Sequence, residues 1–185
     1  MAPSDKLTRL PGIKQADAPF FRARPEGVTV SLLVIHNISL PAGEFGTGYV
    51  DQLFRGTLKK KHPALAKAVG NNAVSAHFFI DRQGEATQYV SVQDAAWHAG
   101  DSSFQQVSDC NDYSIGIELE GSDDVPYTSE QYAALGEITR LLMYHFPAIT
   151  WDRIVGHSDI APSRKTDPGA SFDWTRYQQL LEGAE

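Results

Sequence analysis

Residues 28–35 constrain the fold of this chain more than any other segment. They contain Val28 and Val30 and then the unbroken run Leu32-Leu33-Val34-Ile35, a β-branched and aliphatic pattern typical of a strand buried on both faces. The run ends at His36-Asn37, where a polar loop follows. A strand covered on both faces needs further layers, so the sequence predicts a sheet with helices packed on it.

Other segments supply the remaining elements. Residues 74–81 and 85–90 flank the turn at 82–84 and predict a hairpin, and residues 114–119 predict a neighbouring strand. The clearest helix covers residues 129–146, with a capping box of Thr128 and Gln131 and with Pro147 as its stop. Shorter predicted elements are a helix over 49–54, a strand over 153–156 that leads His157 into a polar loop, and a terminal helix over 174–181.

The size of the chain favours a single domain. Its 185 residues are typical of one hydrophobic core, and a hydrophobic content of 42% with 21% charged residues is ordinary for a globular protein. Residues 1–27 show no clear periodicity and predict an irregular arm packed on a domain of residues 28–185. The order of strands and helices predicts an α/β (α+β) fold with a central mixed sheet flanked by helices.

Charge and cysteine content exclude several classes of protein. A net charge of −7 argues against nucleic-acid binding, and the basic run Lys59-Lys60-Lys61 is expected to be a solvated helix face. The single cysteine, Cys110, excludes an intrachain disulfide framework and is interpreted as structural. No stretch resembles a signal peptide or a membrane span, so we expect a cytoplasmic protein with no membrane partner.

Two histidines and one aspartate suggest a metal site. His36 and His157 each follow an apolar strand, where sheet proteins expose functional side chains, and Asp167 follows in the loop after His157. Two imidazoles and one carboxylate form a ligand set that zinc uses in hydrolases, with a fourth position left for water. Three residues so far apart in the sequence are also readily structural, so their spacing alone does not establish the site.

Two further side chains fit hydrolytic chemistry. Glu118 ends an apolar strand, where burial would raise its pKa toward the range useful for a general base; a surface carboxylate is the simpler alternative. Lys165 lies two residues before Asp167, so it would be near a metal bound there and its charge could stabilise an oxyanion. Together with a metal-activated water, these groups would hydrolyse an amide.

Ordered motifs covering nearly the whole chain resemble one family. The chain is similar to the AmpD family of bacterial anhydro-N-acetylmuramyl-L-alanine amidases, in the zinc amidase superfamily that also includes the peptidoglycan-recognition proteins. The motifs are Ile35-His36-Asn37, Ser75-Ala76-His77-Phe78, Trp97-His98-Ala99-Gly100, Cys110-Asn111-Asp112 with Ile117-Glu118-Leu119, and Gly156-His157 with Lys165-Thr166-Asp167.

The resemblance implies a role for each site residue. It implies that one zinc ion is held by His36, His157 and Asp167, and that Glu118 and Lys165 are the catalytic pair. It also implies that Trp97 faces a sugar and that Asn37 and Arg164 bind muramyl or peptide oxygens, since an aromatic face and a guanidinium suit such ligands. His98, beside Trp97, is expected to line the cleft as a further substrate contact. A core-packing Trp97 is the alternative, and His77 is expected to be a hydrogen-bonded interior residue.

The chain departs from the family pattern at two positions. Relatives often have arginine where this chain has Ala73 and Asp109. Losing these cations would weaken binding of a carboxylate-rich peptide by about 1 to 3 kcal/mol per contact, unless Arg22, Arg24 or Arg82 substitutes.

The resulting functional hypothesis is an amidase of peptidoglycan recycling. It would cleave the amide between the lactyl group of anhydro-N-acetylmuramic acid and the L-alanine of a small soluble muropeptide, and it is expected to act as a monomer. An amidase that attacks intact murein is one rival. A peptidoglycan-fragment binding module without activity is another, although such modules lack a zinc ligand and all three are present here.

Overall fold

The computed structural model describes residues 7–68, 70 and 73–183. The strands are β1 (Lys14–Gln15), β2 (Phe21–Ala23), β3 (Leu32–Ile38), β4 (Phe78–Ile80), β5 (Ala86–Gln88), β6 (Asp94–Ala96), β7 (Ser103–Phe104), β8 (Val107–Ser108), β9 (Ser114–Glu120) and β10 (Ile154–Gly156). The helices are α1 (Tyr49–Phe54), α2 (Leu58–Lys61), α3 (Pro63–Ala68), α4 (Ser129–His145), α5 (His157–Ile160) and α6 (Trp174–Glu182), and η1 (Cys110–Asp112) and η2 (Trp151–Arg153) are 3-10 turns.

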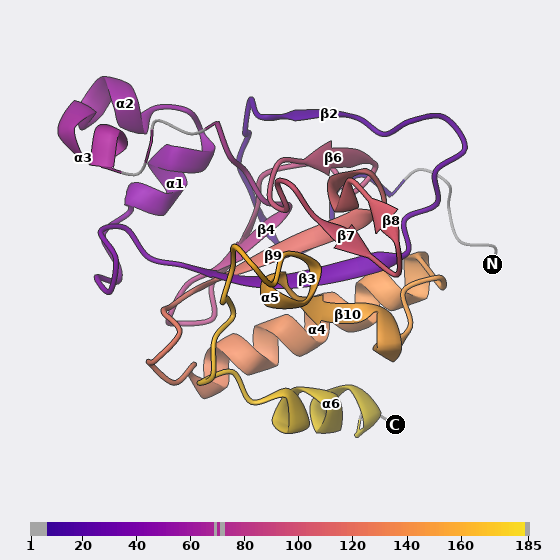
Figure 1. Ribbon diagram of the computed structural model, residues 1–185. Coiled ribbons are helices and arrows are strands. Elements are labelled where there is room, and N and C mark those ends of the chain that lie inside the picture. Colours follow the sequence, from indigo (N-terminus) through magenta and orange to yellow (C-terminus); the bar gives the residue numbers. More distant parts are fainter. Residues whose placement is uncertain (1–6, 69, 71–72, 184–185) are drawn as a thin grey trace.

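A six-stranded mixed sheet forms the centre of the molecule, with the strand order β1-β5-β4-β9-β3-β10. Its neighbouring strands run parallel except for the hairpin of β4 and β5. Helix α4 lies along one face with α6 outside it, whereas α1 to α3 form a group at the end where the chain leaves β3 (Figure 1). The prediction of a mixed sheet flanked by helices is therefore confirmed.

Strand β3 brings the site residues to one face of the sheet. It begins at Leu32 rather than Val28, because the N–H of Val28 instead closes a turn on the carbonyl of Pro25 at 3.3 Å. It also continues to Ile38, so His36 lies within the strand. Residues Leu33 and Ile35 belong to the core cluster that includes α4, whereas Leu32 and Val34 belong to a cluster on the opposite face. By alternation, His36 shares the face opposite α4.

The register of β3 and β9 places two predicted site residues side by side. In this parallel pair His36 is the direct partner of Glu118. Partners in a parallel ladder project to the same face, so both side chains lie opposite α4. The predicted strand over 114–119 is confirmed as β9.

Helix α4 has the predicted caps and buried face. The Thr128 hydroxyl accepts a hydrogen bond from the Gln131 N–H at 3.1 Å, and the Gln131 side chain accepts one from the Thr128 N–H at 3.1 Å. This confirms the capping box. The buried face packs Leu135, Ile138 and Leu142 against the sheet.

Replacing Thr128 by alanine is expected to lower the free energy of unfolding by about 1 to 2 kcal/mol. The change removes the cap of α4 and also the hydrogen bond that the Thr128 hydroxyl donates to the Arg82 carbonyl at 2.9 Å. Chemical denaturation measures the difference. Ser129→Ala at the adjacent exposed position is the control and should leave stability nearly unchanged. Equal stability of both variants would contradict this role of the cap.

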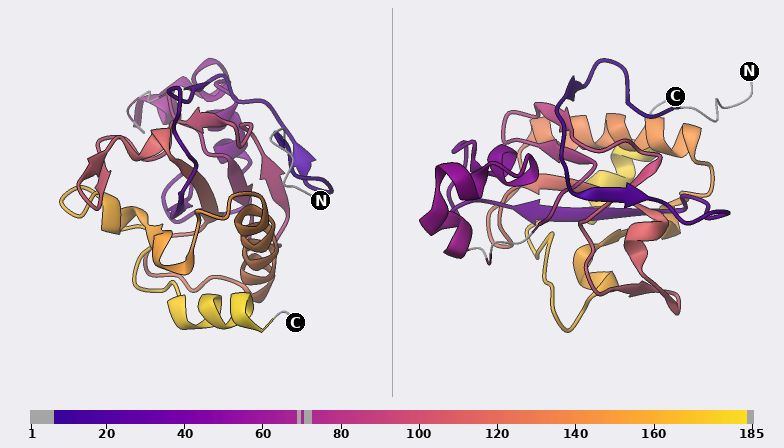
Figure 2. Two further views of the ribbon diagram at one scale, coloured as in Figure 1. Left: turned by 90° about the vertical axis from the view of Figure 1, so that its right-hand side faces the viewer. Right: turned by 90° about the horizontal axis from the view of Figure 1, so that it is seen from above.

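Several sequence predictions need correction. The N-terminal arm is not wholly irregular, because β1 adds to the sheet beside β5 and β2 pairs with β6; the arm's residues 1–6 lie outside the described part. Residues 7–31 run along the outside of the domain before the chain enters β3 (Figure 2). His157 does not enter a loop but is the first residue of α5. The strands predicted over 74–81 and 85–90 are shorter, as β4 and β5.

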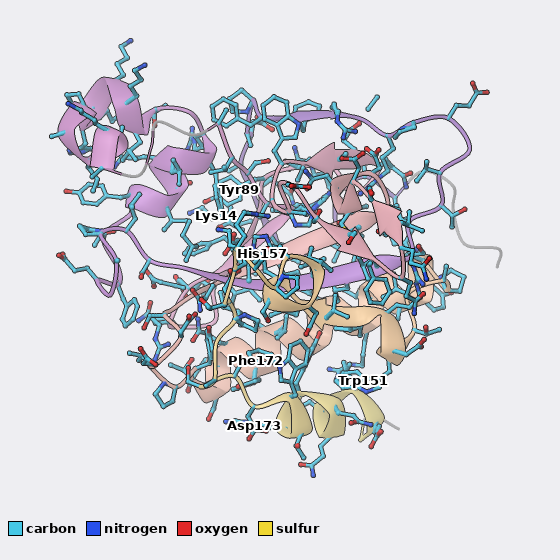
Figure 3. The ribbon with its side chains drawn as sticks, in the orientation of Figure 1. Lys14, Tyr89, Trp151, His157, Phe172 and Asp173 are labelled. Atoms are coloured by element: carbon cyan, nitrogen blue, oxygen red, sulfur yellow. The ribbon has the colours of Figure 1, made fainter. Side chains whose placement is uncertain are left out.

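The remaining helices agree with the sequence. Helix α1 covers the predicted residues 49–54, and Lys59 to Lys61 form the exposed side of α2. Phe172 packs between α4 and α6, and the Tyr177 hydroxyl contacts that of Thr139 at 2.6 Å, which fixes α6 on α4 (Figure 3). Within the described residues, no helix combines the length and apolar character needed to cross a bilayer.

Candidate active site

Three side chains converge on one point at the face of the sheet opposite α4. The Nδ1 atom of His36 lies 2.9 Å from Nδ1 of His157 and 3.2 Å from Oδ2 of Asp167, and the His157–Asp167 distance is 3.0 Å. His36 comes from β3 and His157 follows β10, the parallel neighbour of β3. The Ser158 N–H donates to the Asp167 carbonyl at 3.0 Å and holds the intervening loop closed. Figure 3 shows His157 inside the molecule, close to the central strands.

These three ligand atoms fit a zinc ion. Zinc with N and O ligands at about 2.0–2.2 Å in a tetrahedron spaces neighbouring ligand atoms by roughly 3.3 to 3.6 Å, a few tenths of an ångström more than the 2.9, 3.0 and 3.2 Å found here. The Nε2 atom of His157 donates to the carbonyl of Ala99 at 3.1 Å, so its Nδ1 presents a lone pair toward Asp167. Burial lowers the pKa of His36 to about 4, which keeps this imidazole neutral, as metal binding requires. The three residues form a His/His/Asp group able to hold a metal ion.

Glu118 is a buried carboxylate next to this group. Burial raises its pKa well above the usual range; the negative charge of Asp167 adds to the rise and Lys165 opposes it. Only 9% of the residue is exposed, so it is not the surface carboxylate of the alternative interpretation. Its Oε2 atom is buried and has no hydrogen-bond partner within the described part of the chain. A carboxylate of this kind is available to move a proton.

A groove passes the metal-binding group. A cavity of about 250 Å³ is lined by two of the ligand residues, His157 and Asp167, together with Glu118 and Lys165. Trp97, His98 and residues of β3 and α1 are also part of its wall. A more open cavity of about 520 Å³ adjoins it and shares Asn37, Lys165 and Asp167. Lys165 is thus where the sequence predicted it, partly buried at the wall of the groove.

Trp97 forms part of the groove wall. It is 36% exposed, and its ring stacks on Phe20 from the N-terminal arm with ring centres 6.1 Å apart. The core-packing alternative for this residue is therefore not supported, and its ring is accessible to a ligand in the smaller cavity.

The other predicted substrate contacts already have protein partners. Asn37 uses its amide N–H groups on the Asp123 carboxylate at 2.8 Å and the Pro168 carbonyl at 3.1 Å. This leaves Oδ1, an acceptor, for a ligand. Arg164 donates through Nη2 to the carbonyls of Ala99 and Asp101 at 2.7 and 2.8 Å. Substrate contacts from these residues stay predictions.

His98 and His77 differ in their surroundings. Both ring nitrogens of His98 have protein partners, Nε2 of His36 at 2.9 Å and the Ser114 hydroxyl at 3.1 Å. His98 lines the smaller cavity, as expected, but a substrate contact through its ring nitrogens is not available in this arrangement. His77 is fully buried, accepts from the Gly116 N–H and donates to the Asp94 carbonyl, which confirms the predicted interior role.

None of the three arginines considered as substitutes for the missing family cations reaches the groove. Arg22 pairs with Asp112, and Arg24 is half-buried and donates to backbone carbonyls of Asp112 and Ser114. Arg82 donates to the Pro126 carbonyl and lies over the Phe45 ring. The residues lining the two cavities of the groove do not include these arginines. The weaker binding of a carboxylate-rich peptide, predicted from Ala73 and Asp109, therefore stays a prediction.

Sequence reasoning missed the residues that support the site. The Asn111 side chain accepts from the N–H groups of His98 and Ala99 at 3.1 and 2.8 Å. The Ala99 carbonyl accepts the hydrogen bond from Nε2 of His157. The motif Cys110-Asn111-Asp112 offered a signal for Asn111. A backbone carbonyl has no sequence signal. Cys110 is fully buried and contacts the Tyr113 hydroxyl, in agreement with a structural role outside the metal group.

A mixed sheet that holds two imidazoles, an aspartate and a separate buried carboxylate in one groove defines a class, the hydrolases that work with a single metal ion.

Comparison with known proteins identifies the family within that class. Residues 26–170 match the model of the N-acetylmuramoyl-L-alanine amidase family, and the chain belongs to this family. It is 54% identical over 165 residues to the 1,6-anhydro-N-acetylmuramyl-L-alanine amidase AmpD of Haemophilus influenzae, covering 89% of each chain.

Solved structures agree with this assignment. The crystal structure of a selenomethionine derivative of AmpD matches with a TM-score of 0.89 at 47% identity, covering 95% of this chain and 98% of that one. The amidase AmiD of Escherichia coli, in complex with the substrate anhydro-N-acetylmuramic acid-L-Ala-D-gamma-Glu-L-Lys, matches with a TM-score of 0.60 at 27% identity, covering 86% and 61%.

Proposed function

We propose that this amidase is a zinc enzyme that hydrolyses the amide between the lactyl group of 1,6-anhydro-N-acetylmuramic acid and the L-alanine of a soluble muropeptide, in peptidoglycan recycling. The observation that carries the proposal is the convergence of His36, His157 and Asp167 beside Glu118, in a chain about half identical to amidases named for this substrate. The substrate bound by AmiD, a relative with the same fold, contains the same amide.

The proposed reaction divides the work among a few groups. A zinc ion held by His36, His157 and Asp167 would polarise the amide carbonyl and lower the pKa of a water molecule to about 7. Glu118 takes a proton from the attacking water as the new C–O bond forms. The Lys165 ammonium stabilises the negative charge that develops on the carbonyl oxygen. Glu118 then delivers the proton to the alanine nitrogen as the C–N bond breaks, leaving a lactyl carboxylate and a free peptide.

The groove offers complementary groups for both parts of the substrate. The exposed face of Trp97 suits the apolar face of a sugar. Asn37 keeps only an acceptor, so we assign it to a substrate N–H rather than to a substrate oxygen. Arg164 lines the more open cavity and is assigned to a carboxylate or carbonyl of the ligand.

Two substrates separate this proposal from its rival. The purified protein is incubated with zinc and either anhydro-N-acetylmuramyl-tripeptide or purified intact murein, and the products are identified by mass. Release of free tripeptide from the soluble substrate, with little release from murein, is the expected result. Preferential cleavage of murein would shift the assignment to a wall-degrading amidase, and cleavage of neither substrate would reject the proposed function.

Replacing Trp97 by alanine is expected to raise KM for the soluble substrate by roughly tenfold, equivalent to about 1.4 kcal/mol, with a smaller change in kcat. The reason is loss of the aromatic wall of the cavity, and Trp97→Phe should restore most of the affinity. Tyr144→Ala, at an exposed aromatic position on α4 that lies outside the groove, is the matched control and should behave as wild type. An unchanged KM in Trp97→Ala would exclude Trp97 from substrate binding.

Location and assembly complete the proposal. We assign the protein to the cytoplasm and to a monomeric state, as expected from the sequence. Cell fractionation tests the first assignment and sedimentation of the zinc-loaded protein tests the second.

A further inference from the structure

One short segment, His98-Ala99, provides the hydrogen-bond partner for the second ring nitrogen of both metal-binding imidazoles. The carbonyl of Ala99 accepts from Nε2 of His157 at 3.1 Å. The side chain of His98, the preceding residue, meets Nε2 of His36 at 2.9 Å. Metal-binding histidines usually donate this second N–H to a carboxylate, a carbonyl or a water, so a histidine in that place is unusual.

His98 follows β6 and packs on the sheet at the inner wall of the smaller cavity. The residue is 8% exposed, and its other nitrogen contacts the Ser114 hydroxyl of β9 at 3.1 Å. Its ring lies directly on β9 at Gly116, where a Cβ atom would come within 2.5 Å of Cγ and Nδ1 of His98. The glycine at this strand position is therefore what allows the ring to reach His36.

The hydrogen-bond chain admits two arrangements of protons. In one, His36 donates from Nε2 to Nδ1 of His98, and His98 donates from Nε2 to the Ser114 hydroxyl; the Nδ1 lone pair of His36 then faces His157 and Asp167. In the other, the Ser114 hydroxyl donates to Nε2 of His98, and His98 donates from Nδ1 to Nε2 of His36. His36 then carries its own proton on Nδ1. Only the first arrangement leaves His36 able to bind a metal.

The backbone around His98 is held from several sides. The Asn111 side chain accepts from the N–H groups of His98 and Ala99, and the Trp97 N–H donates to the Ser75 hydroxyl at 3.0 Å. Arg24, which is half-buried, donates to the Asn111 carbonyl at 3.1 Å. Such a restrained segment presents the acceptor atoms in fixed positions.

We propose that His98 is a positioning residue that accepts the Nε2 proton of His36 and so selects the tautomer whose Nδ1 binds the metal. The proposal rests on zinc being the metal, as under the proposed function. It goes further by assigning His98 to the metal site and not to the substrate.

Two matched substitutions test this assignment. An asparagine at position 98 keeps an acceptor near the place of Nδ1, whereas a glutamine reaches toward the place of Nε2 and fills more of the ring's volume. The zinc dissociation constant of the purified full chain is measured for His98→Asn, His98→Gln and His98→Ala by competition with a chromogenic chelator. Thermal unfolding of each zinc-free protein reports separately on packing.

The three variants are expected to differ in zinc affinity, in an order that side-chain packing alone would not produce. His98→Gln and His98→Ala should weaken zinc binding by about 10- to 100-fold, and His98→Asn should remain close to wild type. Affinities that follow side-chain volume, with glutamine better than asparagine, would overturn the proposal, as would wild-type affinity in all three variants. Failure of the wild-type protein to bind zinc would instead reject the metal assignment of the proposed function.

Discussion

Replacing Glu118 by glutamine is expected to lower turnover by at least about 100-fold while zinc binding stays near the wild-type level. The amide has nearly the shape of the carboxylate but cannot accept a proton from water at neutral pH. Glu118 is not one of the three residues of the metal-binding group, so replacing its side chain leaves that group intact. Steady-state hydrolysis of the soluble substrate and the zinc content of the same preparation measure both quantities.

The chain provides a matched control on the same strand. Glu120 is also buried on β9, but its carboxylate accepts from the N–H groups of Gly46 and Arg82 at 2.6 and 3.3 Å. Glu120→Gln should reduce stability and leave turnover within a few-fold of wild type. Near-normal turnover in Glu118→Gln would remove Glu118 from the mechanism.

Replacing Asp167 by asparagine is expected to weaken zinc binding by more than about 100-fold and to abolish activity at low zinc concentration. The carboxylate supplies the one negative charge among the three ligands, and its Oδ2 lies 3.0 and 3.2 Å from the two imidazole nitrogens. A neutral amide at this position is a poor zinc ligand. Chelator competition gives the affinity.

Asp159→Asn is the control for this second prediction. Asp159 is an exposed carboxylate in α5, where it accepts from the Gly156 N–H at 2.7 Å and makes no contact with the metal group. Its amide variant should bind zinc as the wild type does. Unchanged zinc affinity in Asp167→Asn would show that the ligand set is assigned wrongly.

The strongest local patterns predicted the fold well. The apolar run before His36 and the capped, periodic segment of α4 became β3 and α4 because burial and capping act over a few neighbouring residues. The short elements were missed. Strands β1 and β2 are two and three residues long with exposed side chains, and they exist only through pairing with β5 and β6. The four-residue α5 is too short for a periodic signal.

The sequence predicted those parts of the site whose chemistry is carried by side chains. Glu118, His157, Lys165 and Asp167 line one cavity, and His36 contacts His157 and Asp167, as the motifs indicated. The support for these residues was not predictable. Contact between His98 and His36 depends on a glycine at position 116 of a third segment, and the acceptor for His157 is a backbone carbonyl.

Zinc analysis of the purified protein, combined with hydrolysis of anhydro-N-acetylmuramyl-tripeptide before and after metal removal, tests the central claim most directly. The claim is that a single zinc ion at His36, His157 and Asp167 is required for amide cleavage. The account predicts about one zinc per chain, loss of tripeptide release when a chelator removes it, and recovery when zinc is returned. Undiminished tripeptide release from fully metal-free protein would contradict it.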